Sequence, residues 1–140
     1  MNGPKKHVLI ADCDEHVLIR LERLLQDEGF ETTTVWSGRQ MQQELQQRQF
    51  DLLLLADQPP EINCELILRE GRKKGWGVPV IVLENRPRHP FAESYLRTLG
   101  AREIVQKWEP GKVRDAVHGI FSLAHMGAAK SAVAAAMKVG

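Results

Sequence analysis

Short apolar segments alternate with longer amphipathic segments along this chain. Five of the short ones are five or six residues long and rich in aliphatic or β-branched side chains, which predicts strands. Between and after them, apolar residues recur at helical spacing, as at positions 17, 21, 24 and 25. The pattern is therefore a strand followed by a helix, five times over. The expected strands are His7–Ala11, Glu31–Trp36, Asp51–Ala56, Val78–Leu83 and Arg102–Gln106.

Buried strands joined by helices set the fold class. The third strand is an aliphatic run, Leu52–Ala56, as expected for a strand covered on both faces. Parallel strands need helical crossovers, and right-handed crossovers produce a doubly wound sheet. We therefore predict an α/β fold of the flavodoxin-like (βα)5 type, a five-stranded parallel sheet with helices on both faces. Sites in such sheets lie outside the carboxyl ends of the strands, where we expect the functional residues.

The chain has the length of one domain, 140 residues. We expect that domain over residues 1–126. Residues 127–140 are rich in alanine, a strong helix former. They either prolong the last helix, form a short extra one, or begin a linker to a further domain.

Composition excludes several classes of protein. The longest aliphatic run has five residues, whereas a membrane span needs about 20. No basic segment followed by an apolar stretch opens the chain, so no signal peptide is visible. The two cysteines, Cys13 and Cys64, form neither a disulfide framework nor a zinc spacing. We expect reduced thiols and a cytoplasmic protein.

The formal net charge of +1 conceals an asymmetry. Residues 1–70 carry seven Lys and Arg and thirteen Asp and Glu, a net charge of −6. Residues 71–140 carry twelve and five, a net charge of +7. Overall neutrality argues against a general nucleic-acid binder, and the basic clusters lack the interleaved aromatic residues of a single-strand platform. We expect instead a polarised surface whose basic part attracts an acidic partner.

Five segments carry recognisable motifs. They are HVLIADCDEHV at the first strand, GFETTTVWSGRQM at the second, FDLLLLADQPPEINCEL at the third, VPVIVLEN at the fourth and LGAREIVQKWEP at the fifth. Together they resemble the receiver domain of two-component response regulators, over about Lys5 to Ala124. The resemblance implies a CheY-like fold and a role in phosphorelay signal transduction.

The resemblance also implies a phosphorylation pocket, whose reactive residues are mostly replaced here. In the family, a carboxylate ending the third strand accepts a phosphoryl group from a histidine kinase, and that position is Ala56. The two metal-binding positions are Asp12 and Cys13, and a thiol is a poor ligand for Mg²⁺. The hydroxyl position is Glu84, which would repel a phosphoryl group. The family's lysine is retained as Lys107.

Asp57 is the alternative phosphoacceptor. It lies one residue beyond the acceptor position, and one residue along a strand changes the face of the sheet. A local shift at the strand end would be needed to bring it into the pocket, where it would act with Mg²⁺. Asp12 is then a weak candidate metal ligand. We favour a domain that is not phosphorylated and has no cofactor, Mg²⁺ included.

The charges that remain in the pocket predict an internal ion pair. We expect Lys107 to be held by Glu84 or by Asp12, in place of the phosphoryl group and the metal. The alternative is a Glu84 side chain that points to solvent. Neighbouring carboxylates raise the pKa of a thiol, so an inert Cys13 is favoured over a redox sensor.

The fourth and fifth strand–helix units resemble the family's partner or dimer face. The candidate partner-face residues are Arg97, Arg102, Trp108 and Lys112. Trp108 is an interface anchor if it is exposed, and otherwise packs against the last helix. The partner is another signalling protein or a second copy of this chain in a homodimer. We expect no membrane partner, and no nucleic acid unless an output domain is missing from this chain.

These observations combine into one prediction of function. We expect an atypical response regulator receiver domain, a pseudo-receiver, which is not an enzyme and acts by protein–protein interaction. One alternative is a phosphorylated receiver that uses Asp57 with Mg²⁺. Another is a small-ligand-binding module that uses the crevice at the strand ends.

Overall fold

The predicted sheet is present, and the structure gives its strand order. The computed structural model describes residues 4–122. Neighbouring strands run parallel in the order β2-β1-β3-β4-β5. The prediction of a doubly wound, flavodoxin-like α/β fold is therefore confirmed. The strands are β1 (His7–Ala11), β2 (Glu31–Val35), β3 (Leu52–Ala56), β4 (Val80–Glu84) and β5 (Ala101–Gln106).

Most strand boundaries agree with the expected ones to within one or two residues. β4 begins at Val80, two residues later than expected, because Pro79 has no N–H to donate to the ladder. β2 ends at Val35 and leaves Trp36 just beyond the strand. β4 reaches one residue further than expected, so that Glu84 is its last residue.

Capping side chains fix where the helices begin. The carboxylate of Asp14 accepts a backbone N–H in the first turn of α1. Ser37 and Asn63 do the same for α2 and α3. The last expected helix covers residues 110–122 of the described chain. The other helices are α1 (Glu15–Asp27), α2 (Gly38–Gln47), α3 (Cys64–Lys74) and α4 (Pro90–Thr98).

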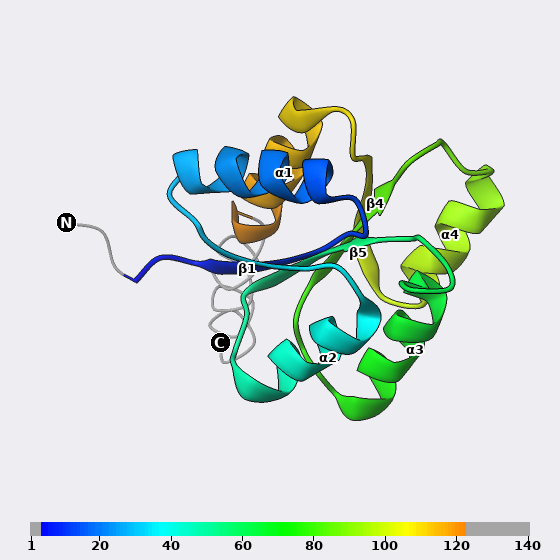
Figure 1. Ribbon diagram of the computed structural model, residues 1–140. Helices are drawn as coiled ribbons and strands as arrows, with labels where there is room; N and C mark the ends of the chain where they lie inside the picture. Colours follow the sequence, from blue (N-terminus) through cyan, green and yellow to red (C-terminus); the bar gives the residue numbers. More distant parts are fainter. Residues whose placement is uncertain (1–3, 123–140) are drawn as a thin grey trace, which may run out of the picture.

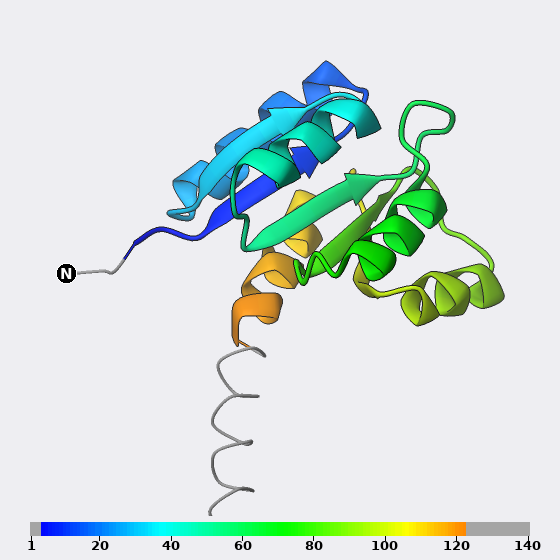
Figure 2. The ribbon, with the colours of Figure 1, turned by 90° about the horizontal axis from the view of Figure 1, so that it is seen from below.

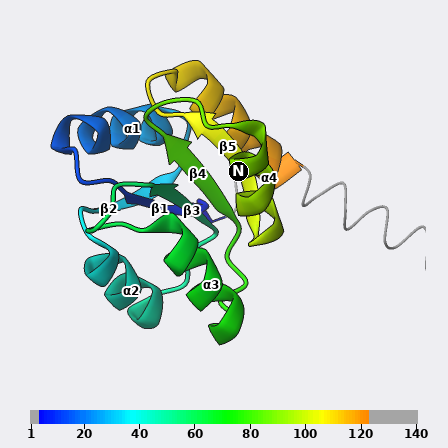
Figure 3. The same cartoon turned by 90° about the vertical axis from the view of Figure 1, so that its right-hand side faces the viewer.

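The helices cover both faces of the sheet. α1 and helix 110–122 lie on one face, and α2 and α3 lie on the other (Figures 1 and 3). Successive strand residues point to opposite faces, so two separate cores form. In β3, Leu54 and Ala56 pack on the side of α1, whereas Leu53 and Leu55 pack on the side of α2 and α3. This alternation decides which side chains can meet at the strand ends.

α4 is attached to its neighbours largely by polar contacts. It lies beside α3 at the end of that helical layer (Figure 2). Leu96 is the one buried residue of α4. Arg69 of α3 bonds to the hydroxyl of Tyr95, and Arg72 donates to the carbonyl oxygen of Thr98 at 3.0 Å. Polar side chains from α3 therefore add to the packing of Leu96 in holding α4 against the rest of the fold.

Two predictions concern parts of the chain at its ends. The expected domain boundary at residue 126 and the alanine-rich tail over 127–140 lie outside the described residues. Within residues 4–122, no helix is long and apolar enough to cross a membrane.

Candidate functional site

The strand register brings the predicted pocket residues to one edge of the sheet. Ala11 pairs with Leu55, so Asp12 follows β1 beside the end of β3. In β4 and β5, Glu84 pairs with Gln106, the residue before Lys107. Asp12, Ala56, Glu84 and Lys107 are all buried. This edge is the carboxyl end of the strands, where the sequence predicts the site.

Asp12 and Lys107 form a buried ion pair in this pocket. The Lys107 ammonium lies 3.3 Å from Oδ2 of Asp12, and the two side chains are 3% and 0% exposed. The other carboxylate oxygen accepts the N–H of Asp14 at 2.8 Å. A buried charge needs a partner of opposite charge, and here each group supplies the other's. The prediction that Lys107 is held by an internal carboxylate is therefore confirmed, with Asp12 as the partner.

The Glu84 side chain does not bind Lys107, and the alternative in which it points to solvent is wrong. Its side chain is 1% exposed, and its Oε1 accepts a hydrogen bond from Gln106 at 2.8 Å. Its Oε2 lies 2.7 Å from Nε of Arg88, although these two atoms are not aligned as a hydrogen bond. Only the backbone carbonyl of Glu84 contacts Lys107, by accepting the Lys107 N–H at 2.9 Å.

The pKa of the Glu84 carboxyl lies above its ordinary value. Burial is the main cause, and the negative charge of Glu93 adds to it. Arg88 and Gln106 oppose this rise without cancelling it. Glu84 is thus only partly compensated by its cation.

Asp57 is held by the same arginine. Nη2 of Arg88 lies 2.5 Å from its Oδ2, and the backbone N–H of Cys64 donates to its Oδ1 at 3.1 Å. Burial by itself raises the pKa of Asp57. The hydrogen bonds from Arg88 and Cys64 lower it by more than burial raises it, so the pKa lies below its ordinary value. Asp57 is therefore an ionised carboxylate on the side of α3, with both oxygens bonded to protein groups.

The two carboxylates after β1 and β3 do not share a pocket. Ala56 packs in the core on the side of α1, whereas Cys64, the neighbour of Asp57, packs in the core of the opposite face. Among the described residues, no hydrogen bond or ion pair joins Asp57 to Asp12 or Lys107. The expected change of face after one residue is present here.

Arg88 is the site residue that the sequence did not predict. It lies in the loop between β4 and α4 and bridges Asp57 and Glu84, with its side chain 26% exposed. Its position four residues after Glu84 offers no signal, because the intervening segment is a loop, not a helix. The sequence did carry one indirect indication of such a residue. Asp57 and Glu84 are carboxylates at positions where the family has none, and buried carboxylates need a cation nearby.

Cys13 follows Asp12 and is exposed, and it lines a hollow between α1 and the end of β2. Its backbone N–H donates to the side chain of Gln58 at 2.6 Å. Burial, Asp12 and Glu61 together raise the pKa of its thiol, in that order. The expected rise in its pKa is therefore confirmed, and it lowers the fraction of reactive thiolate.

The donor set of this pocket does not fit Mg²⁺. Magnesium prefers several hard oxygen ligands. Here Cys13 offers a thiol and Ala56 offers no donor. The Oδ2 atom of Asp12 is already paired with the Lys107 ammonium. The carboxylates of Asp57 and Glu84, which the sheet brings to the same edge, are paired with Arg88. Within residues 4–122, no group of three or more His, Cys, Asp or Glu side chains is arranged to hold a metal ion.

The predicted partner-face residues lie around β5 and helix 110–122. Arg102 and Lys112 line one hollow of about 400 Å³ beside that helix. Arg97 donates to the carbonyl of Arg102 at 3.2 Å and lies 3.9 Å from a carboxylate oxygen of Glu103. These cations remain at the surface, partly paired with acidic neighbours.

Trp108 is 46% exposed, so it is not buried against helix 110–122. Its indole N–H donates to the side chain of Asn85 at 2.5 Å. The Lys107 ammonium lies 5.4 Å from the centre of its ring. Trp108 therefore joins the loops after β4 and β5 above the buried lysine.

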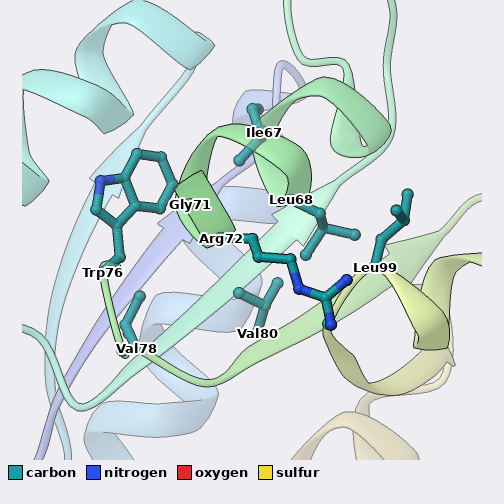
Figure 4. Close-up of a pocket in the computed structure, with 10 residues that line it drawn as sticks. Ile67, Leu68, Gly71, Arg72, Trp76, Val78, Val80 and Leu99 are labelled. Atoms are coloured by element: carbon teal, nitrogen blue, oxygen red, sulfur yellow. The ribbon is translucent and has the colours of Figure 1, made fainter. Parts of the chain in front are cut away.

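An apolar hollow lies at the other end of β4. It has a volume of about 200 Å³ between α3 and the turn from α4 to β5 (Figure 4). Ile67, Leu68 and Val80 line it, and the Trp76 ring packs against Gly71 at its edge. A Cβ added at Gly71 would lie 2.6 Å from the Trp76 ring, so glycine is needed there. This hollow is separate from the strand-end crevice that the sequence offered as a ligand site.

The topology, the pocket at the carboxyl ends and the positions of Asp12 and Lys107 define the class as a receiver domain. A family model described as response regulator receiver domain matches residues 8–118, so the chain belongs to this family. The family's domains are in general signalling modules rather than enzymes.

Similar proteins agree with this family. Response regulator SaeR from Staphylococcus aureus is 28% identical over 117 residues, 84% of this chain and 50% of that protein. The chain thus spans about half the length of the curated relatives it matches. A CheY-like receiver domain protein from Methanospirillum hungatei is 19% identical, with a TM-score of 0.74 over 83% of this chain and 93% of that one. TrrA from Thermotoga maritima, in complex with Mg²⁺-BeF, is 25% identical, with a TM-score of 0.71 over 82% and 98%.

Proposed function

We propose that this receiver domain is not phosphorylated and acts in two-component signalling by binding other proteins. The observation that carries the proposal is Ala56 at the end of β3. Phosphoryl transfer to a receiver needs a carboxylate nucleophile, and a methyl group supplies none. Ala56 is itself buried in the core on the side of α1.

The contacts of the remaining charged groups support the same proposal. A developing phosphoryl group needs cations that are free to approach it. Here the Lys107 ammonium is bonded to Asp12, and the Arg88 guanidinium is bonded to Asp57 and Glu84. These contacts occupy the charged groups that a phosphoryl group and a metal would otherwise bind, although Arg88 offsets only one of the two negative charges of Asp57 and Glu84. The domain is thereby held in one state without either, and it needs no Mg²⁺.

The partner surface in this proposal is the basic surface of the fourth and fifth units. Arg97, Arg102 and Lys112 give it positive charge, and Trp108 gives it an exposed aromatic anchor. We propose an acidic surface of another signalling protein, or of a second copy, as its partner. Binding should weaken from low to moderate salt, since surface attraction is screened over about 8–10 Å.

Intact-mass measurement tests the proposal. The protein is incubated with Mg²⁺ and acetyl phosphate, beside a phosphorylatable receiver domain that shows the donor is active. The expected result is an unmodified mass for this chain. A stoichiometric phosphoryl adduct that disappears in the Asp57→Asn variant would overturn the proposal in favour of Asp57 as acceptor.

A second measurement tests the metal. Any ligand that binds the folded state must raise the Tm. We expect millimolar MgCl₂ to leave the Tm where an equal ionic strength of NaCl leaves it. A saturable rise that Asp12→Asn abolishes would show a magnesium site and contradict the proposal.

A further inference from the structure

Helix α1 has three distinct faces. Successive residues are 100° apart on a helix, so residues three and four apart share a face. Val17, Leu21 and Leu25 form the core face. Arg20 and Arg23 lie about a third of a turn away from it, on an exposed basic face. The third face carries Glu15, Leu18, Ile19 and Glu22.

That third face lies over one side of strand β2. β2 is an edge strand, paired only with β1. Thr32, Thr34 and Trp36 alternate onto the same side of the chain. The Gln26 side chain donates to the Thr32 hydroxyl at 3.0 Å and ties the far end of α1 to β2.

A groove lies between α1 and the end of β2, and we name it the α1–β2 groove. Its volume is about 470 Å³. Leu18, Ile19, Thr34 and Trp36 line it, with Glu15 and Glu22 on the side of the helix.

The groove exposes two large apolar side chains to solvent. Ile19 is 56% exposed and Trp36 is 60% exposed. The backbone N–H of Trp36 donates to the side chain of Gln40 at 2.9 Å, which holds the start of the connection to α2 in place. Exposed apolar side chains that border a hollow with a polar rim are typical of protein-binding sites.

The charge at the groove selects the kind of partner. Glu15 and Glu22 are the charged residues that line it, and both are acidic. Arg23 follows Ile19 by one helical turn, but neither Arg20 nor Arg23 lines the groove, so its charged lining is acidic. The basic surface of the fourth and fifth units lies on other elements of the fold.

We propose that the α1–β2 groove binds a segment of another protein in which a large apolar residue stands between Lys or Arg residues. The apolar residue packs between Ile19 and Trp36, and the flanking cations pair with Glu15 and Glu22. This proposal is independent of phosphorylation and uses a different surface from the basic one. A domain with both surfaces can hold an acidic and a basic partner at once.

Selection from a random peptide library displayed on phage tests the proposal. The bait is the full chain, and the matched baits are Trp36→Ala and, as a control, Phe91→Ala. Phe91 is 81% exposed on α4, away from the groove. We expect enriched peptides with an apolar residue between basic ones, recovered about tenfold less by Trp36→Ala and equally by Phe91→Ala. An acidic consensus, equal recovery by Trp36→Ala or no enrichment would overturn the proposal.

Charge substitutions on one helix test the rim with the best peptide. Glu22→Lys should weaken its binding by about tenfold, whereas Asp27→Lys, the same charge change on another face, should change it by less than about twofold. Equal weakening by the two substitutions would mean that the overall charge of the helix binds the peptide. That result would reject the α1–β2 groove as the binding site. Self-association in sedimentation velocity that Trp36→Ala abolishes would make a second copy the occupant and would also reject the proposal.

Discussion

Two charge clusters lie at the carboxyl ends of the strands, and they differ in how they are built. Asp12 and Lys107 form a one-to-one pair that is almost fully buried. On the side of α3, Arg88 alone serves two carboxylates, Asp57 and Glu84, and is itself 26% exposed. The first cluster is neutral, whereas the second keeps one excess negative charge.

The difference shows two ways of filling a pocket without a phosphoryl group. The first cluster uses positions that the family keeps, and joins them to each other. The second introduces carboxylates at new positions and brings a loop arginine in to compensate them. Because one guanidinium serves two acids, the pKa of Glu84 stays raised while that of Asp57 is lowered. The contribution of the second cluster to stability should therefore depend on pH.

Breaking the neutral pair should have the largest effect. Lys107→Met leaves the Asp12 carboxylate buried without a cation, which should cost about 3–5 kcal/mol of unfolding free energy. Urea denaturation measures it, with Lys112→Met as an exposed control that should change it by less than about 0.5 kcal/mol. The double variant Asp12→Leu/Lys107→Met should recover much of the loss. A loss in the double variant as large as in Lys107→Met would show that the pair is not the cause.

Removal of the shared arginine should have a smaller effect. Arg88→Ala leaves Asp57 and Glu84 without their cation, but Asp57 is partly exposed and water can solvate it, so we expect a loss of about 2 kcal/mol. The matched control is Arg86→Ala, an exposed arginine of the same loop. Equal stabilities of the two variants in urea denaturation would mean that the bridge through Arg88 is energetically silent.

The two acids of the second cluster should give pH dependences of opposite sign. Asp57 has a lowered pKa, so its contribution is present above the unfolded pKa of about 3.9 and is lost as the pH falls through the folded value. Glu84 has a raised pKa, so the folded state binds its proton more tightly and acidification below neutrality favours folding.

Denaturation at a series of pH values from about 6 to 3 separates these contributions. Asp57→Asn should make the loss of stability on acidification shallower than in the wild type. Glu84→Gln should make it steeper, because the opposing contribution is removed. Parallel profiles for the two variants would contradict the assignment of opposite shifts.

Thiol labelling should give the smallest signal, and it reports on both clusters. Cys13 beside Asp12 is exposed with a raised pKa, so iodoacetamide should label it, though more slowly than a free thiol. Cys64 beside Asp57 is buried, and its pKa is raised to about 12, so it should be labelled only after opening. Arg88→Ala should speed labelling of Cys64 more than that of Cys13. Mass spectrometry of peptides measures both rates.

The sequence predicts the fold and the first cluster because both follow from local pattern. Aliphatic runs such as Leu52–Ala56 mark the buried strands, and strand ends mark the site. Asp12 and Lys107 stand at such ends, so the topology alone brings them together. Ala56 is also predictable, because a missing nucleophile is visible without coordinates.

The second cluster and the groove are not predictable in the same way. Arg88 reaches its partners from a loop, and no periodicity relates a loop residue to a strand end. The exposure of Trp36 depends on how far α1 covers the edge strand β2, which packing decides. Both features need the three-dimensional course of the connections.

The bond between Asp12 and Lys107 also sets an order of events in folding. It joins residues 95 positions apart, from the first strand–helix unit to the last. Closing so long a loop costs entropy, so we expect the bond to form only after the intervening strands have assembled. Contacts made after the rate-limiting step slow unfolding without speeding folding. We therefore expect the pair to slow unfolding, and so to lengthen the time for which the assembled pocket persists.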